Sequence, residues 1–291
     1  MAKSAFKRGL GIDALQSVKA LLDTEIGRRI KEEPKLNICI REDYVNIYCN
    51  GSSILKFTPC PDRYEIHYKY TQEPKSGNYL ALNLDCGDLV VGNFNLSKLI
   101  NDPDCYIGEY VCGEKEHLAR YLSSDQSPTI IDLEVAYTCK RKGKSGRDYV
   151  AKRIDLAVIE NNKLQLIEVK IDTDGRLRSE KDGDQEILEQ MQSYREFIAS
   201  ESANIIQSYK TIAQNIIDLD LVHKMGGTPK FTAENLKEFI RNEECLAVEP
   251  VLLIIETGKS KIGRNGINHW DRLLSQFDRL GFPPPRIWAS Q

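Results

Sequence analysis

The chain has 291 residues, of which 41% are hydrophobic and 29% charged, and its net charge at pH 7 is -3. This length allows one large domain or two ordinary ones with a sizeable core. The charge excludes binding to nucleic acid through overall attraction, so any such binding must come from local basic patches. No apolar run is as long as a membrane span, and the first eight residues lack the apolar core of a secretory signal. We therefore expect a cytoplasmic protein with no membrane partner.

The cysteines and histidines do not follow the spacing of a metal or disulfide framework. The eight cysteines, at positions 39, 49, 60, 86, 105, 112, 139 and 245, include no C-x-x-C pair, and several lie in apolar runs. The four histidines show no zinc-type spacing. We expect reduced, buried thiols and neither an iron–sulfur cluster nor a structural zinc site.

The first hundred residues show one helical pattern followed by several strand patterns. Residues 13–32 carry apolar side chains at helical spacing and stop before Pro34, which predicts an amphipathic helix. Apolar residues then alternate from 36 to 70, which predicts an antiparallel meander, with a hairpin at Asn50–Gly51. Further strand patterns follow at 79–84 and 89–91.

A strong breaker, Asn101–Asp104, follows these strands. We predict a domain boundary between it and Gly113. Residues 1–112 would then form an N-terminal αβ module for recognition, partner binding or sensing, which could include a partner protein or a second subunit. Residues 113–291 would form the second domain.

The second domain begins with a short helix at 114–123, followed by a strand at 129–139 and a basic turn at 140–147. Two apolar, β-branched runs at 154–159 and 164–171 are separated by Glu160–Lys163, which predicts a hairpin. Three helices are predicted next, at 185–199, at 205–216 and from the cap Thr232 to Ile240. A buried strand at 251–256 and a closing helix at 267–280 complete the chain.

Three charged residues in the predicted hairpin form the candidate site. Asp155 lies in the first strand, and Glu168 and Lys170 lie two apart in the second, so they project from one face. Charges among leucine and isoleucine are costly unless they are paired. Hard oxygen ligands select ions such as Mg2+ or Mn2+, and the two carboxylates with the carbonyl of Val169 could hold them. Lys170 would orient an attacking water or stabilise developing charge.

This pattern resembles the PD-(D/E)XK nuclease superfamily, in which an Asp and a later Glu-x-Lys lie on neighbouring strands. The matching residues are Ile154–Asp155, with Ile in place of the usual Pro, and Glu168–Val169–Lys170. Gln190 and Tyr194 are similar to the Q-x-x-x-Y element of the RecB-like branch. The resemblance covers about residues 113–200, with the strand at 251–256 completing the sheet. It implies an α+β chain with a restriction-endonuclease-like αβββαβ core, in which helices flank a mixed central sheet.

The family's activity implies a Mg2+- or Mn2+-dependent deoxyribonuclease acting on double- or single-stranded DNA, in DNA repair, restriction or anti-phage defence. The resemblance gives catalytic roles to Asp155, Glu168, Lys170, Gln190 and Tyr194. A further acidic residue upstream is expected as a metal ligand. We favour Glu134, because a charge between Leu133 and Val135 needs a reason, and keep Glu114 and Glu116 as alternatives.

Basic residues near the predicted site are candidates for contact with a phosphate backbone. Gly258–Arg264 superficially resembles a phosphate loop but lacks the preceding glycine of a Walker A sequence, so an NTPase is not expected. The alternative to a nuclease is a non-catalytic nucleic-acid-binding or scaffold protein that retains the fold. The nucleic-acid-binding candidates are Lys140, Arg141, Lys142, Lys144, Arg147, Lys152, Arg153, Arg176 and Arg178.

Overall fold

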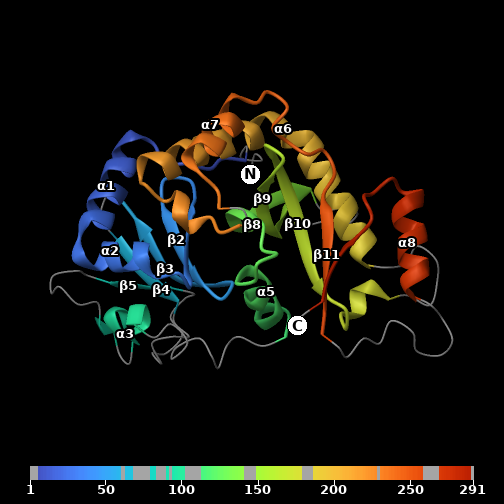
Figure 1. Cartoon of the computed structure of the whole chain (residues 1–291), viewed down its shortest axis with the longest axis horizontal. Helices are drawn as coiled ribbons and strands as arrows, with labels where there is room; N and C mark the ends of the chain where they lie inside the picture. Colours follow the sequence, from blue (N-terminus) through green and yellow to red (C-terminus); the bar gives the residue numbers. More distant parts are fainter. Residues whose placement is uncertain are drawn as a thin grey trace.

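The computed structural model describes residues 6–59, 63–67, 79–82, 90–91, 94–101, 113–140, 149–178, 186–227, 230–257 and 269–289. Within these residues the chain is a mixed α+β protein with two five-stranded sheets (Figure 1). The predicted boundary region between Asn101 and Gly113 lies outside the described residues, as does most of the basic turn that follows Lys140.

The N-terminal helical pattern forms two helices rather than the single helix we predicted. They are α1 (Ile12–Asp23) and α2 (Glu25–Glu32). Thr24 between them is extended, and its hydroxyl accepts a hydrogen bond from the backbone N–H of Gly27 at 3.0 Å. Thr24, which caps α2, therefore separates the two helices, although the apolar pattern continues across it.

The predicted meander is confirmed as an antiparallel sheet with strands in sequence order. Asn50 and Gly51 have φ angles of 48° and 69°, as expected for a two-residue hairpin between its second and third strands. A small pair of strands and a short helix, α3 (Leu96–Asn101), follow. The strands are β1 (Leu36–Ile40), β2 (Val45–Cys49), β3 (Ser52–Thr58), β4 (Arg63–His67), β5 (Tyr79–Leu82), β6 (Val90–Val91) and β7 (Phe94–Asn95).

The second sheet has the strand order β12-β11-β10-β9-β8. Its three long strands pair antiparallel, whereas β10 with β11 and β11 with β12 are parallel, so the sheet is mixed. The order α5, β8, β9, β10, α6, β11 confirms the expected αβββαβ core. We did not predict β12, which follows three prolines. The elements are α5 (Glu114–Leu122), β8 (Thr129–Lys140), β9 (Tyr149–Glu160), β10 (Lys163–Ile171), α6 (Glu186–Asp218), β11 (Val251–Glu256) and β12 (Arg286–Ala289).

The helix α6 runs along the top of the molecule in Figure 1, over both the N-terminal strands and the second sheet. We predicted two helices here, but the 33 residues from Glu186 to Asp218 include no glycine or proline, and the helix continues through them. The remaining helices are α7 (Ala233–Arg241), which starts with a capping box at Thr232, and α8 (His269–Arg279). Short 3-10 turns occupy Gly175–Leu177 and Val222–Lys224.

One continuous hydrophobic core joins the N-terminal elements to the second sheet through α6. A second cluster packs α5 against the opposite face of that sheet. The two sheets are also joined by a buried ion pair, in which Arg41 donates hydrogen bonds to the carboxylate of Asp132 and to the carbonyl of Leu133. Tyr209 of α6 completes this network with a hydrogen bond of 3.2 Å to Asp132. The parts of the chain before and after residue 112 therefore share their interior.

Three of the cysteines, Cys39, Cys49 and Cys245, are buried with reduced thiols, as predicted for them. The other five cysteine side chains lie outside the described part of the chain. Among the described residues, no helix has the length and apolar character needed to cross a membrane.

Candidate active site

The candidate site lies where the backbone pairing between β9 and β10 ends. These strands pair from Glu160↔Lys163 as far as Leu156↔Ile167. The turn between them consists of Asn161 and Asn162, both with positive φ, which confirms the predicted hairpin. Beyond the last pair, the carboxylate of Asp155 accepts the backbone N–H of Val169 at 2.8 Å. A side chain thus replaces a ladder bond and fixes the Asp155 carboxylate beside the next residues of β10.

Lys170 brings the acidic residues together. Its side chain is only 2% exposed, and its ammonium donates hydrogen bonds to the carboxylate of Glu168 and, at 2.6 Å, to the carbonyl of Val169. The ammonium nitrogen also lies 3.9 Å from Oδ2 of Asp155 and 3.5 Å from Oε2 of Glu114. One cation therefore faces three carboxylates.

Two residues of α6 hold Glu168 from its other side. Nε2 of Gln190 donates to Oε1 of Glu168 at 2.6 Å, and the hydroxyl of Tyr194 lies 2.6 Å from Oε2. Gln190 also donates to the Tyr194 hydroxyl, which lies 2.8 Å from the carbonyl of Arg153. Their spacing of four residues places both side chains over β10. Both side chains thus contact Glu168, the ion-pair partner of Lys170.

The structure separates the three candidates for the upstream acid. Glu114, in the first turn of α5, lies in the cluster at Lys170. Glu134, which we favoured, instead has its carboxylate beside Arg153 at 3.3 Å and Lys115 at 3.7 Å. Glu116 pairs with Arg120 one turn along its own helix. The geometry therefore favours Glu114, an alternative that the apolar flanks of Glu134 had placed second.

Burial and mutual repulsion change the acidity of the cluster. Burial, and then the charge of Asp155, raise the pKa of Glu168 to about 8. Burial likewise raises the pKa of Asp155, against the opposing effect of Lys170, and the pKa of Glu114. Burial alone would lower the pKa of Lys170, but the carboxylates around it raise that pKa above its usual value. One buried and two partly buried carboxylates thus exceed the charge that one ammonium can neutralise.

The donor set fits a hard divalent cation in its chemistry. Asp155, Glu168 and Glu114 offer carboxylate oxygens, Val169 offers a carbonyl, and a buried oxygen of Glu114 accepts no hydrogen bond. Within the described ranges, however, no three acidic, histidine or cysteine side chains converge closely enough to hold an ion in the arrangement shown. The ammonium of Lys170 lies among these oxygens, so ion binding would require it to withdraw.

The predicted phosphate-contact residues are not all placed. Lys152 donates to the hydroxyl of Ser193 at 2.8 Å, and Arg153 is largely exposed beside Glu134. Arg176 forms a close ion pair with Asp174 and lies 3.8 Å from Glu114, whereas Arg178 donates to the carbonyl of Asp172 at 3.4 Å. Arg141, Lys142, Lys144 and Arg147 lie outside the described residues, and so does the side chain of Lys140.

Two neighbours of the cluster were missed from the sequence. Lys115, next to Glu114, approaches Glu134, and Asp174 holds Arg176 beside Glu114. Asp174 could have been noticed, because it continues the alternation of Glu168 and Lys170 past the end of β10. No local pattern marks Lys115, since its role depends on how α5 packs against the sheet.

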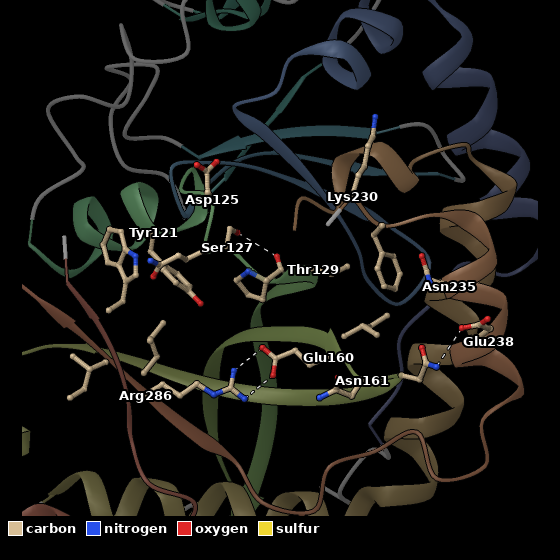
Figure 2. A pocket seen from close by; sticks show the side chains of 18 residues that line it. Tyr121, Asp125, Ser127, Thr129, Glu160, Asn161, Lys230, Asn235, Glu238 and Arg286 are labelled. Carbon is tan, nitrogen blue, oxygen red and sulfur yellow. Dashed lines mark hydrogen bonds and ion pairs between the residues drawn. The ribbon is translucent and has the colours of Figure 1, made fainter. Parts of the chain in front are cut away.

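A cavity of about 760 Å3 lies at the β9–β10 turn (Figure 2). It is lined by Asn161, Trp288 and Tyr121, and by Arg286, which forms a two-bond ion pair with Glu160. None of the clustered acids or Lys170 lines it.

No protein-family model, curated protein or solved structure matches this chain.

Proposed function

We propose that this protein is a metal-dependent nuclease that hydrolyses DNA phosphodiester bonds, of the RecB-like PD-(D/E)XK class. The single observation that carries the proposal is the position of the Lys170 ammonium among the oxygens of Asp155, Glu168, Glu114 and Val169. The αβββαβ order and the contacts of Gln190 and Tyr194 with Glu168 support it.

Phosphodiester hydrolysis requires attack by a water oxygen on phosphorus, breakage of the bond to the leaving sugar oxygen and protonation of that oxygen. Bound Mg2+ or Mn2+ would make the water more acidic and neutralise charge on the phosphate. Asp155, Glu168 and the carbonyl of Val169 would hold the ion, and Glu114 supplies a further carboxylate. Lys170 would orient the water or stabilise the developing charge.

Gln190 and Tyr194 would act by fixing the Glu168 carboxylate. A carboxylate that accepts hydrogen bonds on both oxygens has little freedom to rotate, and such supporting contacts tune the affinity of metal ligands. Burial raises the pKa of the Tyr194 phenol above its usual value, so the hydroxyl stays protonated and able to donate.

The proposal is tested by incubating plasmid and single-stranded DNA with Mg2+ or Mn2+, with and without EDTA, beside the Lys170→Ala variant. We expect cleavage by the parent protein that EDTA abolishes and that Lys170→Ala lacks. Metal-independent cleavage, or a Lys170→Ala protein as active as the parent, would contradict the proposal. DNA binding without cleavage of any DNA would favour the alternative, a non-catalytic nucleic-acid-binding protein.

A further inference from the structure

Glu134 has an unusual backbone conformation directly beside the acidic cluster. Its φ is 49°, in the left-handed region that residues with long side chains rarely adopt. In the β8–β9 register, Leu133 pairs with Leu156 and Val135 with Ile154, so Glu134 lies opposite Asp155. Such an outlier next to a candidate site indicates a role for the side chain.

Two cations from different elements converge on the Glu134 carboxylate. Lys115 of α5 has its ammonium 3.7 Å from Oε1, and Arg153 of β9 has Nη1 3.3 Å from Oε2. Lys115 is adjacent in sequence to Glu114, and Arg153 is two residues before Asp155. Both cations are accessible, since their side chains are 44% and 64% exposed. A phosphate group could therefore reach them from solvent.

The charges of this trio and of the acidic cluster are complementary in sign. Lys115 and Arg153 carry two positive charges against the single carboxylate of Glu134. A surplus of one positive charge thus lies beside a cluster in which three carboxylates face one ammonium. A phosphodiester has one negative charge and several acceptor oxygens, which suit a guanidinium and an ammonium.

We propose that Lys115 and Arg153, positioned by Glu134, form a subsite that binds a backbone phosphate of DNA next to the acidic cluster. Glu134 is then a positioning residue rather than a metal ligand. The role of this subsite in cleavage rests on the proposed nuclease function, but its binding of phosphate can be measured without cleavage.

The test is fluorescence anisotropy of a labelled single-stranded DNA oligonucleotide, in EDTA, at salt concentrations from about 50 to about 200 mM. Lys115→Ala and Arg153→Ala should each weaken binding and reduce the salt slope by about 0.7, the contribution of one phosphate contact on a single strand. Arg153→Lys should keep most of the slope because it keeps the charge. Arg120→Ala is the matched control for Lys115→Ala, because Arg120 also lies on α5 but pairs with Glu116. The salt slope of this variant should equal that of the parent.

Glu134→Gln separates positioning from metal binding. It should bind the oligonucleotide more weakly in EDTA, since the two cations lose the carboxylate that positions them, and its Mg2+ affinity by calorimetry should equal that of the parent. Glu134→Asn provides a second variant, because asparagine tolerates a left-handed φ. Urea denaturation of each variant confirms that it is folded.

A loss of Mg2+ affinity of about tenfold or more in Glu134→Gln would instead make Glu134 a metal ligand and overturn the inference. Unchanged salt slopes in Lys115→Ala and Arg153→Ala would also overturn it, as would a parent protein that does not bind the oligonucleotide in EDTA. If the variants show the predicted salt slopes but the parent protein cleaves no DNA, the phosphate subsite is supported and the proposed nuclease function is contradicted.

Discussion

The hydroxyl of Tyr194 lies 2.6 Å from the carboxylate of Glu168, which connects the long helix α6 to the strand that carries the Glu-x-Lys sequence. The same hydroxyl is 2.8 Å from the backbone carbonyl of Arg153, two residues before Asp155. One buried phenol thus contacts both strands of the candidate site. The separation between Asp155 and Glu168 consequently depends on α6 as well as on the sheet.

Tyr194→Phe should lower the free energy of unfolding by about 1–3 kcal/mol, because the buried Glu168 carboxylate loses the hydroxyl as a hydrogen-bond donor. It should also lower the rate of Mg2+-dependent DNA cleavage by about 10-fold to 100-fold, as expected for a residue that supports a metal ligand. Urea denaturation and a cleavage assay measure the two effects. Tyr137→Phe is the control, since the Tyr137 hydroxyl approaches Ser193 rather than Glu168. Equal losses of rate in the two variants would contradict the role given to Tyr194.

Lys170→Met should destabilise the metal-free protein by about 3–5 kcal/mol at pH 8, because Glu168, Asp155 and Glu114 would lose their shared cation. A divalent cation could then occupy the place of the ammonium. Saturating Mg2+ should therefore raise the melting temperature of Lys170→Met more than that of the parent. A smaller rise in the variant would show that Lys170 does not lie where the ion binds.

The pKa of Glu168 predicts how the effect of Mg2+ on stability depends on pH. This pKa is about 8 in the folded protein and about 4.5 when the side chain is unperturbed. Because the folded value is the higher one, the group contributes stability below about 4.5 that is lost as pH rises through about 8. Mg2+ requires the ionised carboxylate. The melting temperature should therefore rise more with Mg2+ at pH 9 than at pH 6, and an equal or larger rise at pH 6 would contradict this coupling.

Glu114→Gln should weaken Mg2+ binding by about tenfold or more, whereas Glu116→Gln should leave it unchanged. Both substitutions remove one charge from α5, but only Glu114 lies beside Lys170, while Glu116 pairs with Arg120. Isothermal titration calorimetry with Mg2+ compares them directly. Equal affinities in the two variants would exclude Glu114 as the upstream acid.

Arg41→Ala should lower the free energy of unfolding by about 3–5 kcal/mol, because it removes the closer of the two cations at the buried Asp132 carboxylate and leaves only Arg8, whose Nε lies 3.8 Å away. Because the two sheets share one core, the loss should appear as a shift of a single unfolding transition. Lys31→Ala is the control, since its partner Asp220 is exposed, and should cost less than about 1 kcal/mol. Two separate transitions in the Arg41 variant would show that the sheets unfold independently.

Much of the architecture was predictable because local patterns specify it. Alternating apolar residues and the turn residues Asn50–Gly51 and Asn161–Asn162 define strands and hairpins without distant contacts. The Thr232 cap also acts locally. The predicted helix boundaries were wrong where polar residues interrupt an apolar pattern, because such residues can either end a helix or lie within it. Thr24 ended a helix, whereas the polar residues near Glu201 did not end α6, because Glu201 is buried and accepts the backbone N–H of Phe6.

The sequence by itself determined the spacing of Asp155, Glu168, Lys170, Gln190 and Tyr194, because strand and helix periods place these side chains on known faces. Only the tertiary structure showed that Glu114, and not Glu134, has its carboxylate beside Lys170. Both are glutamates near apolar residues, but Glu114 lies close to Lys170, whereas Glu134 lies close to Lys115 and Arg153. That depends on the packing of α5 against β10 and on the left-handed backbone of Glu134 in β8, neither of which a local sequence pattern specifies.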